Sequence, residues 1–451
     1  MNSAYCLLSL LYTKSMVVSA AGDLLTFPLL HEASIRHRSL LESGDDALPR
    51  RRLAGTKRRS SPETIPTYQG YGAFYIDIYV GTPPQRQTVL IDSGSEKVAI
   101  PCKNCVDCGD GHTDEHFDHS LSESFQELAC SQCFRGECDV GRDRCAATSS
   151  YAEGSSWKGI EVQDFIYPGG PHDEALDVVK TSNDDDTYSG VKPMSAAKYR
   201  FPLKFTCMES VEGAFKNQLA DGIMGLSLRN GSFWSQMHEH DAMVSRQFSI
   251  CMRKHPFTPQ QTHAVGVMTL GGVDDRLHTS EMIFMEYTPI DMGMYGVHIR
   301  KIYVRPGGGE KLAGANADFN LSRGKNYLVD ADESVINHGS VILDSGTTDT
   351  ILSAGLKPHF DKAWEKVMRM PFPTEPVSIT PDELMGWPTI IFQMKGSSHA
   401  SNSSNSDARK LDKEHPNDVL VAFPPSHYML FDIRKNVYLP RLHMHDTYGG
   451  R

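Results

Sequence analysis

The sequence predicts a mainly β protein built from two domains. Short apolar runs with two-residue periodicity, separated by turn residues, begin at Tyr71 and continue to about residue 305. The chain has 451 residues, which fits two domains of ordinary to large size once tails and insertions are subtracted. A short pattern of apolar strand, Asp, hydroxyl residue and Gly also occurs twice, once in each half of the chain.

The composition supports a buried core and argues against several classes of partner. Hydrophobic residues make up 39% of the chain, whereas 22% charged residues and 25 prolines leave room for long loops. The net charge of −11 leaves no excess of cations to replace phosphate counterions, so we expect no nucleic-acid partner. An acidic chain also does not suit an anionic membrane surface, and no apolar run reaches the roughly 18 residues that span a bilayer.

The first residues predict export. Residues 5–20 are apolar and end in Val18-Ser19-Ala20, a small-residue pattern typical of signal-peptide cleavage. We therefore expect residues 1–21 to be a signal peptide and the protein to enter the secretory pathway, for the endoplasmic reticulum, an endolysosomal compartment or the exterior. Lys14 interrupts the apolar stretch, so an ordinary apolar N-terminus, or a translation start at Met16, remains the alternative.

Residues 22–65 are expected to form a pro-segment. They are polar and lack strand periodicity, and residues 47–61 contain basic side chains without any acid. The two basic clusters are candidate processing sites, and they also have the charge to cover an acidic cleft. A solvated linker is the alternative. The basic residues are Arg50, Arg51, Arg52, Lys57, Arg58 and Arg59.

The regular elements follow in order. Residues 73–80 alternate in strand fashion, residues 81–84 (Gly-Thr-Pro-Pro) form a turn, and residues 87–91 form a second strand that runs into Asp92. In the second half, apolar residues recur at helical spacing over residues 355–369. Polar segments at 170–198, 305–326 and 395–417 are expected to be exposed loops. Three glycosylation sequons, each weak alone, begin at Asn230, Asn320 and Asn402.

The cysteines indicate a disulfide-bonded insertion. Of ten cysteines, Cys6 would leave with the signal peptide, and seven of the others crowd into residues 102–145. Dense cysteine in an exported chain favours disulfides, although the C-x2-C-x2-C run with nearby histidines also permits zinc. We expect no metal or cofactor. The disulfide candidates are Cys102, Cys105, Cys108, Cys130, Cys133, Cys138, Cys145, Cys207 and Cys251.

The repeated pattern carries the predicted chemistry. Each copy is an apolar strand followed by Asp92-Ser93-Gly94-Ser95 or by Asp344-Ser345-Gly346-Thr347. Two aspartates held face to face cannot both ionise, so the pair keeps one proton and acts as a single acid–base unit. A water between them can lose a proton to one carboxylate while the other protonates a carbonyl oxygen. The sequence therefore predicts metal-free hydrolysis; two unrelated β-turns would be the alternative.

The neighbours of the two aspartates fit this chemistry. Gly94 and Gly346 allow two backbones to approach closely and turn sharply. The remaining positions are hydroxyl residues, which we expect to donate hydrogen bonds that orient the carboxylates. These hydroxyl residues are Ser93, Ser95, Ser345 and Thr347.

This repeated D-[ST]-G-[ST] pattern resembles the hallmark of the pepsin-like aspartic proteases. The resemblance extends from about Tyr71 to about Phe431 and includes segments 74–85, 220–226, 270–274 and 387–392. It implies a bilobal acid-protease fold with the active-site cleft between two β lobes. The lobes would be residues 66–288, with the insertion at 102–145, and residues 289–451.

Residues 151–159 (Tyr-Ala-Glu-Gly-Ser-Ser-Trp-Lys-Gly) resemble the flap hairpin of that family. The resemblance implies that Tyr151 lies over the substrate and excludes water, with Gly154 and Ser155 beside it. A hairpin tyrosine that packs on its neighbours is the alternative. Ala99 stands where many members have a Trp bonded to the flap tyrosine, which puts the flap geometry in question.

The cysteine-rich insertion is similar to that of plasmepsin V-like proteases and of plant nepenthesin-type enzymes. Ala152 departs from plasmepsin V, which has a cysteine beside its flap tyrosine. The family's last apolar-Leu-Gly segment is not found before Arg451, so we expect the second lobe to be C-terminally incomplete. A missing segment would also hold any membrane anchor and the partners of Cys207 or Cys251.

The predicted function is that of an aspartic endopeptidase made as a secretory-pathway zymogen. It would act as a monomer on polypeptides bound extended in the cleft. Two other hypotheses remain: a non-catalytic, inhibitor-like binding protein on the same scaffold, and a zinc-dependent Cys/His module attached to a β domain. The presence of both Asp92 and Asp344 argues against the first. Disulfide bonding of the cysteines would exclude the second.

Overall fold

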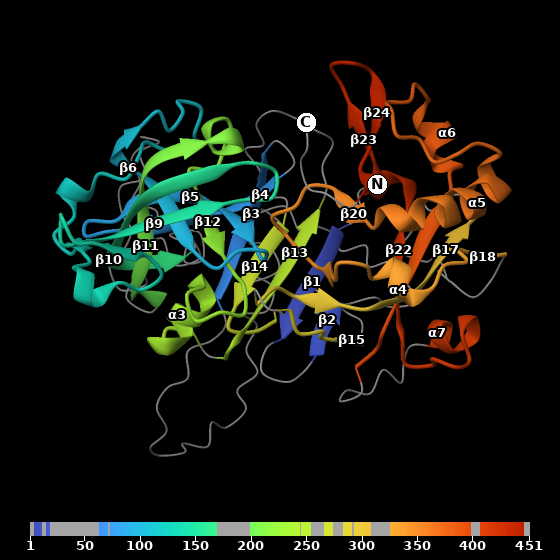
Figure 1. The fold of residues 1–451 in the computed structure, drawn as a ribbon, viewed down its shortest axis with the longest axis horizontal. Coiled ribbons are helices and arrows are strands. Elements are labelled where there is room, and N and C mark those ends of the chain that lie inside the picture. The colour runs from blue at the N-terminus through green and yellow to red at the C-terminus, as the bar shows by residue number, and fades with distance from the viewer. Residues whose placement is uncertain are drawn as a thin grey trace, which may run out of the picture.

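A computed structural model describes most of both predicted lobes. The described residues are 4–10, 15–18, 63–70, 73–168, 199–243, 245–253, 266–273, 283–290, 293–307, 325–397 and 406–445. Figure 1 shows a blue-to-green lobe on the left and an orange-to-red lobe on the right, joined by strands between them. The prediction of a mainly β, two-lobed protein is confirmed.

One large sheet forms the N-terminal lobe and continues between the lobes. Its strand order is β15-β2-β1-β13-β14-β3-β4-β5-β12-β6-β11-β10-β9-β8, and β7 pairs with β10. The strands are β1 Ala4–Leu10, β2 Ser15–Val18, β3 Glu63–Gly70, β4 Ala73–Val80, β5 Gln85–Asp92, β6 Val98–Val106, β7 Gln126–Glu127, β8 Glu137–Asp139, β9 Arg144–Ser150, β10 Ser156–Pro168, β11 Phe201–Glu212, β12 Gly222–Gly225, β13 Gln247–Arg253, β14 Gly266–Leu270 and β15 Ile283–Glu286. Short helices η1 His119–Leu121, η2 Cys130–Gln132, η4 Gly213–Lys216 and α3 Phe233–Glu239 connect them.

Strands β4 and β5 confirm the prediction for residues 73–91 but are buried more completely than alternation implies. Ile76 and Ile78 on one face are fully buried, and Tyr75 and Asp77 on the other are also buried. Ile76 and Ile78 pack in the main hydrophobic core, and the edges of β4 are hydrogen-bonded to β3, β5 and β10. This burial fixes the strand that carries Asp92.

Several small sheets and helices form the C-terminal lobe. Strands β18-β17-β21-β22 make a four-stranded sheet, and the pairs β16–β19, β20–β25 and β23–β24 make two-stranded sheets. The strands are β16 Gly296–Val297, β17 Ile299–Arg305, β18 Tyr327–Leu328, β19 Val341–Ile342, β20 Thr350–Leu352, β21 Thr389–Met394, β22 Val419–Phe423, β23 Met429–Asp432, β24 Val437–Pro440 and β25 Leu442–Met444. The helices are α4 Glu333–Ile336, η6 Ala354–Leu356, α5 Lys357–Met368, α6 Pro381–Met385, α7 Ser406–Leu411 and α8 Pro425–Tyr428.

Helix α5 is the amphipathic helix that the sequence predicts at 355–369. It buries Phe360 and Trp364 completely. The Trp364 ring lies edge-on to Phe372, at 4.9 Å between ring centroids, and to Tyr428, at 5.8 Å. This aromatic cluster, with Trp387 5.9 Å from Trp364, is the core of the second lobe.

Some elements differ from the sequence prediction. Strand β3 begins at Glu63, so regular structure starts before Tyr71 and crosses the predicted end of the pro-segment at residue 65. Within the predicted loop 395–417, helix α7 forms because Ala408 is fully buried against the four-stranded sheet. Strands β1 and β2 lie on the predicted signal peptide, whose removal stays a prediction.

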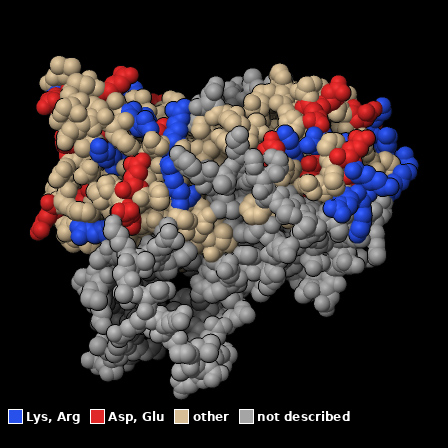
Figure 2. Space-filling model, turned by 90° about the horizontal axis from the view of Figure 1, so that it is seen from below, with Lys and Arg blue, Asp and Glu red and all other residues tan. Residues whose placement is uncertain are grey.

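Other predictions fall on residues outside those described. They include the basic clusters between 50 and 59, most of the loops at 170–198 and 305–326, and the sequons at Asn320 and Asn402. Asn230 is described and exposed, so glycosylation there stays a prediction. Within the described residues, no helix is long and apolar enough to cross a bilayer. Figure 2 shows acidic and basic side chains interspersed over both ends of one face.

Candidate active site

The two Asp loops lie where the lobes meet. Strand β5 ends at Asp92, and β12 runs parallel beside it, with the Leu226 N–H donating to the Asp92 carbonyl at 2.8 Å. In the other lobe β19 ends two residues before Asp344, and the Leu343 N–H donates to the Tyr295 carbonyl at 2.9 Å. Each Asp is therefore placed by the end of a paired strand.

Buried Asp221 supports the first loop from behind. Its carboxylate accepts from the Thr88 N–H at 2.5 Å and from the Thr88 hydroxyl at 2.6 Å. The other carboxylate oxygen accepts from the Asp114 N–H at 2.9 Å. Burial raises the Asp221 pKa to about 7. The family resemblance of segment 220–226 does not by itself indicate that this carboxylate links β12 to β5.

Four hydrogen bonds join the two loops across the lobe boundary. The Ser93 N–H donates to the Ser345 hydroxyl at 3.0 Å, and the Ser345 N–H donates to the Ser93 hydroxyl at 2.8 Å. The Ser93 hydroxyl donates to the Leu343 carbonyl at 3.2 Å, and the Ser345 hydroxyl donates to the Ile91 carbonyl at 2.8 Å. We call this set the serine cross-link. It corrects the expectation that Ser93 and Ser345 orient the carboxylates, because both hydroxyls bind the opposite backbone instead.

The cross-link brings the two carboxyl groups into contact. A β-carbon added to Gly94 would lie 2.8 Å from the carboxyl carbon of Asp344. A β-carbon added to Gly346 would overlap the Asp92 carboxylate. Only glycine leaves room for the opposite aspartate at either position, so the expected reason for both glycines is confirmed. The side chains of Asp92 and Asp344 are also hydrogen-bonded to one another.

The electrostatics of the pair differ between its two members. Asp92 is 5% exposed, and burial raises its pKa to about 7, with further contributions from the charge of Asp344 and the hydrogen bond to it. The Gly94 N–H, which donates to the Asp92 carboxylate at 2.9 Å, acts in the opposite direction. Asp344 is half-buried and accepts from the Gly346 N–H at 2.9 Å and from the Thr347 hydroxyl at 2.5 Å. Burial of Asp92 therefore favours retention of one proton by the pair.

The predicted flap is a hairpin between β9 and β10. Residue pairs Ser150–Ser156 through Ala146–Ile160 are in antiparallel register, and the Tyr151 N–H donates to the Ser155 carbonyl at 2.8 Å. Gly154 is exposed at the tip with a φ of +95°, a backbone conformation that favours glycine. Buried Ser155 accepts from the Ala214 N–H at 2.8 Å through its hydroxyl, which ties the tip to η4.

Tyr151 faces the first Asp loop and is held by its own hairpin. The indole N–H of Trp157 donates to the Tyr151 hydroxyl at 3.1 Å, and the Phe215 ring lies edge-on at 5.2 Å. Burial, followed by the charge of Asp92, raises the Tyr151 pKa. Trp157 therefore supplies the indole that the sequence analysis missed when it considered only Ala99. The signal was available, because Trp157 lies within the flap segment itself.

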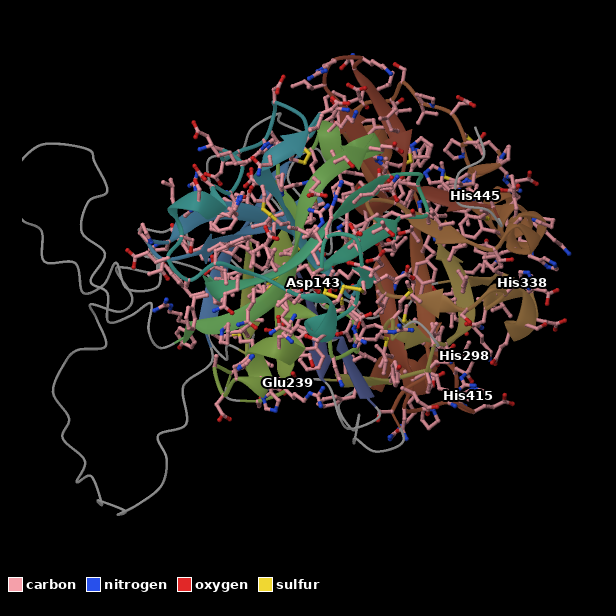
Figure 3. The ribbon with its side chains drawn as sticks, turned by 60° about the vertical axis from the view of Figure 1, so that its left-hand side comes forward. Asp143, Glu239, His298, His338, His415 and His445 are labelled. Carbon is pink, nitrogen blue, oxygen red and sulfur yellow. A yellow bond between two sulfur atoms is a disulfide. The ribbon has the colours of Figure 1, made fainter. Side chains whose placement is uncertain are left out.

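All seven cysteines of the insertion are disulfide-bonded. The pairs are Cys102–Cys207, Cys105–Cys108, Cys130–Cys138 and Cys133–Cys145. Figure 3 shows Asp143 beside the sulfur atoms of the insertion, where its carboxylate accepts from the Cys130 N–H at 3.2 Å. The insertion therefore offers no thiolates for zinc. The expectation that the partner of Cys207 lies in a missing segment is wrong, because that partner is Cys102; Cys251 is also disulfide-bonded.

The second Asp loop has a support that the sequence analysis did not identify. Asp349 accepts from Arg441 at 2.9 Å and contacts the His443 ring nitrogen at 3.0 Å, and β20 pairs with β25 in the same place. The His443 hydrogen bond and the Arg441 charge hold the pKa of Asp349 below its usual value, against the effect of burial. This contact links the residues after Asp344 to the strand near residue 443.

Two groups of described residues have ligand atoms close enough for a metal ion, and neither includes a residue of the Asp loops. One contains Cys133 and Cys145, which are bonded to each other. The other is Asp412, Glu414 and His415, where the Asp412 carboxylate already accepts from Lys301 at 2.7 Å. Figure 3 places His415 in the C-terminal lobe. The Asp pair itself contains the carboxyl groups that acid–base chemistry on a water molecule requires.

Comparisons with known proteins match part of this chain to one family model and to several proteases. A family model described as Xylanase inhibitor N-terminal matches residues 74–272. Aspartic protease 5 of Toxoplasma gondii is 29% identical over 228 residues, covering 46% of this chain and 20% of that protein. Plasmepsin V of Plasmodium falciparum is 28% identical over 191 residues, covering 41% of this chain and 28% of its own length. Aspartic proteinase nepenthesin-2 of Nepenthes gracilis is 23% identical over 297 residues, which cover 65% of this chain and 55% of that protein. The chain thus spans less than two thirds of each relative.

Proposed function

We propose that this chain belongs to the pepsin-like aspartic protease family and is an aspartic endopeptidase with Asp92 and Asp344 as its catalytic pair. The contact between these two carboxyl groups, fixed by the serine cross-link, is the observation that carries the proposal. The relatives named as aspartic proteases support the protease class. The roles of individual residues in this chain are part of the proposal.

In the proposed reaction, a water molecule binds between the two carboxyl groups. Ionised Asp344 takes a proton from this water, and protonated Asp92 donates its proton to the carbonyl oxygen of the scissile peptide. The water oxygen bonds to the carbonyl carbon, and the tetrahedral product collapses with proton transfer to the leaving amine. Because burial raises the Asp92 pKa to about 7, we expect Asp92 to keep its proton up to near-neutral pH.

The flap hairpin gives the proposed substrate site its cover. Tyr151 lies beside the first Asp loop and is fixed by Trp157, while Gly154 leaves the tip exposed. An extended polypeptide placed between the hairpin and the Asp loops would present its backbone to an open strand edge, as an added strand does. Polypeptides are therefore the proposed substrates of a monomeric enzyme.

A secretory route is supported by the disulfides. Four pairs among the described cysteines require an oxidising compartment. Together with the predicted signal peptide and basic processing sites, they support synthesis as a zymogen in the secretory pathway.

A second candidate is a non-catalytic binding protein on the same scaffold. The description of the matching family model, which names an inhibitor, favours this candidate. It predicts peptide binding without turnover. The presence of both aspartates, each with its supporting hydrogen bonds, favours the enzyme.

The test is hydrolysis of a peptide library by the full chain, beside Asp92→Asn and the control Asp382→Asn. Asp382 lies exposed in the first turn of α6, so its substitution leaves the Asp pair intact. We expect cleavage by the wild type and by the control, no cleavage by Asp92→Asn, and inhibition by a statine-type transition-state mimic. Cleavage that persists in Asp92→Asn and resists the mimic would refute the proposal. Binding without cleavage by the wild type would favour the second candidate.

A further inference from the structure

The cysteine-rich insertion contacts the chain directly after the first Asp loop. Arg135 Nε lies 2.6 Å from Glu96 Oε1, and Glu96 follows Ser95 of the loop. The Glu96 side chain is 15% exposed, and the Gly231 N–H also donates to it at 3.3 Å. A β-carbon on Gly231 would lie 2.6 Å from Glu96 Oε1 and 2.9 Å from Arg135 Nε, so the three residues are closely packed. This ion pair is therefore partly screened from water by its surroundings.

Lys97, the next residue, links the same segment to the flap hairpin. The Lys97 ammonium donates to the Thr148 carbonyl of β9 at 2.8 Å and lies 5.5 Å from the centre of the Trp157 ring. Trp157 in turn holds Tyr151. Residues 96 and 97 are thus bonded both to the insertion and to the flap hairpin.

A buried carboxylate fixes the backbone that carries Arg135. Glu161 of β10 is 4% exposed, and its two oxygens accept from the Phe134 N–H at 2.7 Å and from the Arg135 N–H at 2.6 Å. The Cys133–Cys145 disulfide holds the residue before Phe134 to the start of β9. Because its backbone is already held on both counts, only the side chain of Arg135 has to be ordered to place its guanidinium on Glu96.

We propose that Arg135 is a positioning residue for the first Asp loop, acting through Glu96. The insertion is then part of the support of the catalytic centre rather than an attached module. Its disulfide and the Glu161 contacts fix Arg135, Arg135 fixes Glu96, and Glu96 fixes the loop that ends at Ser95. The inference rests on the proposed function, because it assigns the loop a catalytic role.

The test compares R135Q with R142Q in the full chain. Arg142 belongs to the same insertion but is exposed, and its contact with Asp139 is 3.9 Å long. We expect R135Q to lower kcat on the order of tenfold with KM within about twofold, because displacement of a catalytic group slows chemistry more than binding. R142Q should match the wild type. If Arg135 acts through Glu96, the double variant E96Q/R135Q should be no slower than the slower single variant.

A second measurement is independent of activity. Amide hydrogen exchange should be faster over residues 90–99 in R135Q than in R142Q, because the loop loses its anchor. Equal exchange in the two variants, or independent effects of E96Q and R135Q on kcat, would overturn the inference. Failure of the proposed function gives a different result, because the wild-type chain would then not cleave peptides. The exchange comparison still decides the role of Arg135 in that case.

Discussion

The serine cross-link allows a quantitative prediction. Ser93 is 3% exposed, and its hydroxyl both accepts from the Ser345 N–H and donates to the Leu343 carbonyl. Ser93→Ala removes both bonds and leaves one donor and one acceptor without their partner at the lobe boundary. A buried polar group left unpaired costs about 1–3 kcal/mol, so we expect Ser93→Ala to lower the free energy of unfolding by about 2–6 kcal/mol.

The measurement is urea unfolding followed by far-UV circular dichroism, combined with peptide hydrolysis. Ser93→Thr keeps the hydroxyl and should lose much less stability than Ser93→Ala. Ser120→Ala removes an exposed hydroxyl that bonds only within its own turn, so we expect a change within about 0.5 kcal/mol. The activity of Ser93→Ala should fall with its stability, because the same bonds hold Asp92 against Asp344. If Ser93→Ala unfolds at the same urea concentration as Ser120→Ala, the cross-link does not stabilise the protein and the reasoning is wrong.

Three other predictions concern separate parts of the structure. Burial lowers the pKa of His427 to about 3 from 6.5, so the unfolded chain binds a proton that the folded chain excludes as pH falls below 6.5. His427→Leu should therefore reduce the loss of stability between pH 6.5 and pH 4, by up to about 3 kcal/mol in thermal unfolding scans; equal losses in both proteins would count against it. Removing the Cys102–Cys207 disulfide, which closes a separation of 105 residues, should cost about 5 kcal/mol on the chain-entropy model, against about 2 kcal/mol for Cys105–Cys108, as compared by denaturant midpoints. The reverse order would contradict that model. Trp157→Phe removes the hydrogen bond to the Tyr151 hydroxyl and should lower kcat/KM about tenfold. The pH at which activity falls should stay the same, because Asp92 is not altered. Kinetics equal to those of the wild type would refute the role of the indole.

The sequence predicted the Asp pair because its signal is local. A strand, an Asp, a hydroxyl and a glycine are adjacent in each copy, so the chemistry is visible without the fold. The partners of the hydroxyls were predicted wrongly, because Ser93 and Ser345 bond to backbone 250 or more residues away. Only the meeting of the two lobes decides that choice.

Other misses have a similar physical origin. Helix α7 lies in a polar segment of the sequence. The burial of Ala408 that supports this helix depends on the neighbouring sheet, so the local sequence does not reveal it. The Arg135–Glu96 contact joins two charged residues that each look like ordinary surface side chains in the sequence. Helix α5 and strands β4 and β5 were predicted because periodicity within a single segment specifies them.

The serine cross-link also determines how the two halves can move. Because these bonds join the two Asp loops directly, we expect any rocking of one half against the other to pivot near the cross-link, where displacements are smallest. Widening to admit a bulky chain would then be largest far from the cross-link, as at the hairpin tip, while the spacing of the two aspartates changes little. The hairpin tip could thus move without changing the alignment of the two aspartates.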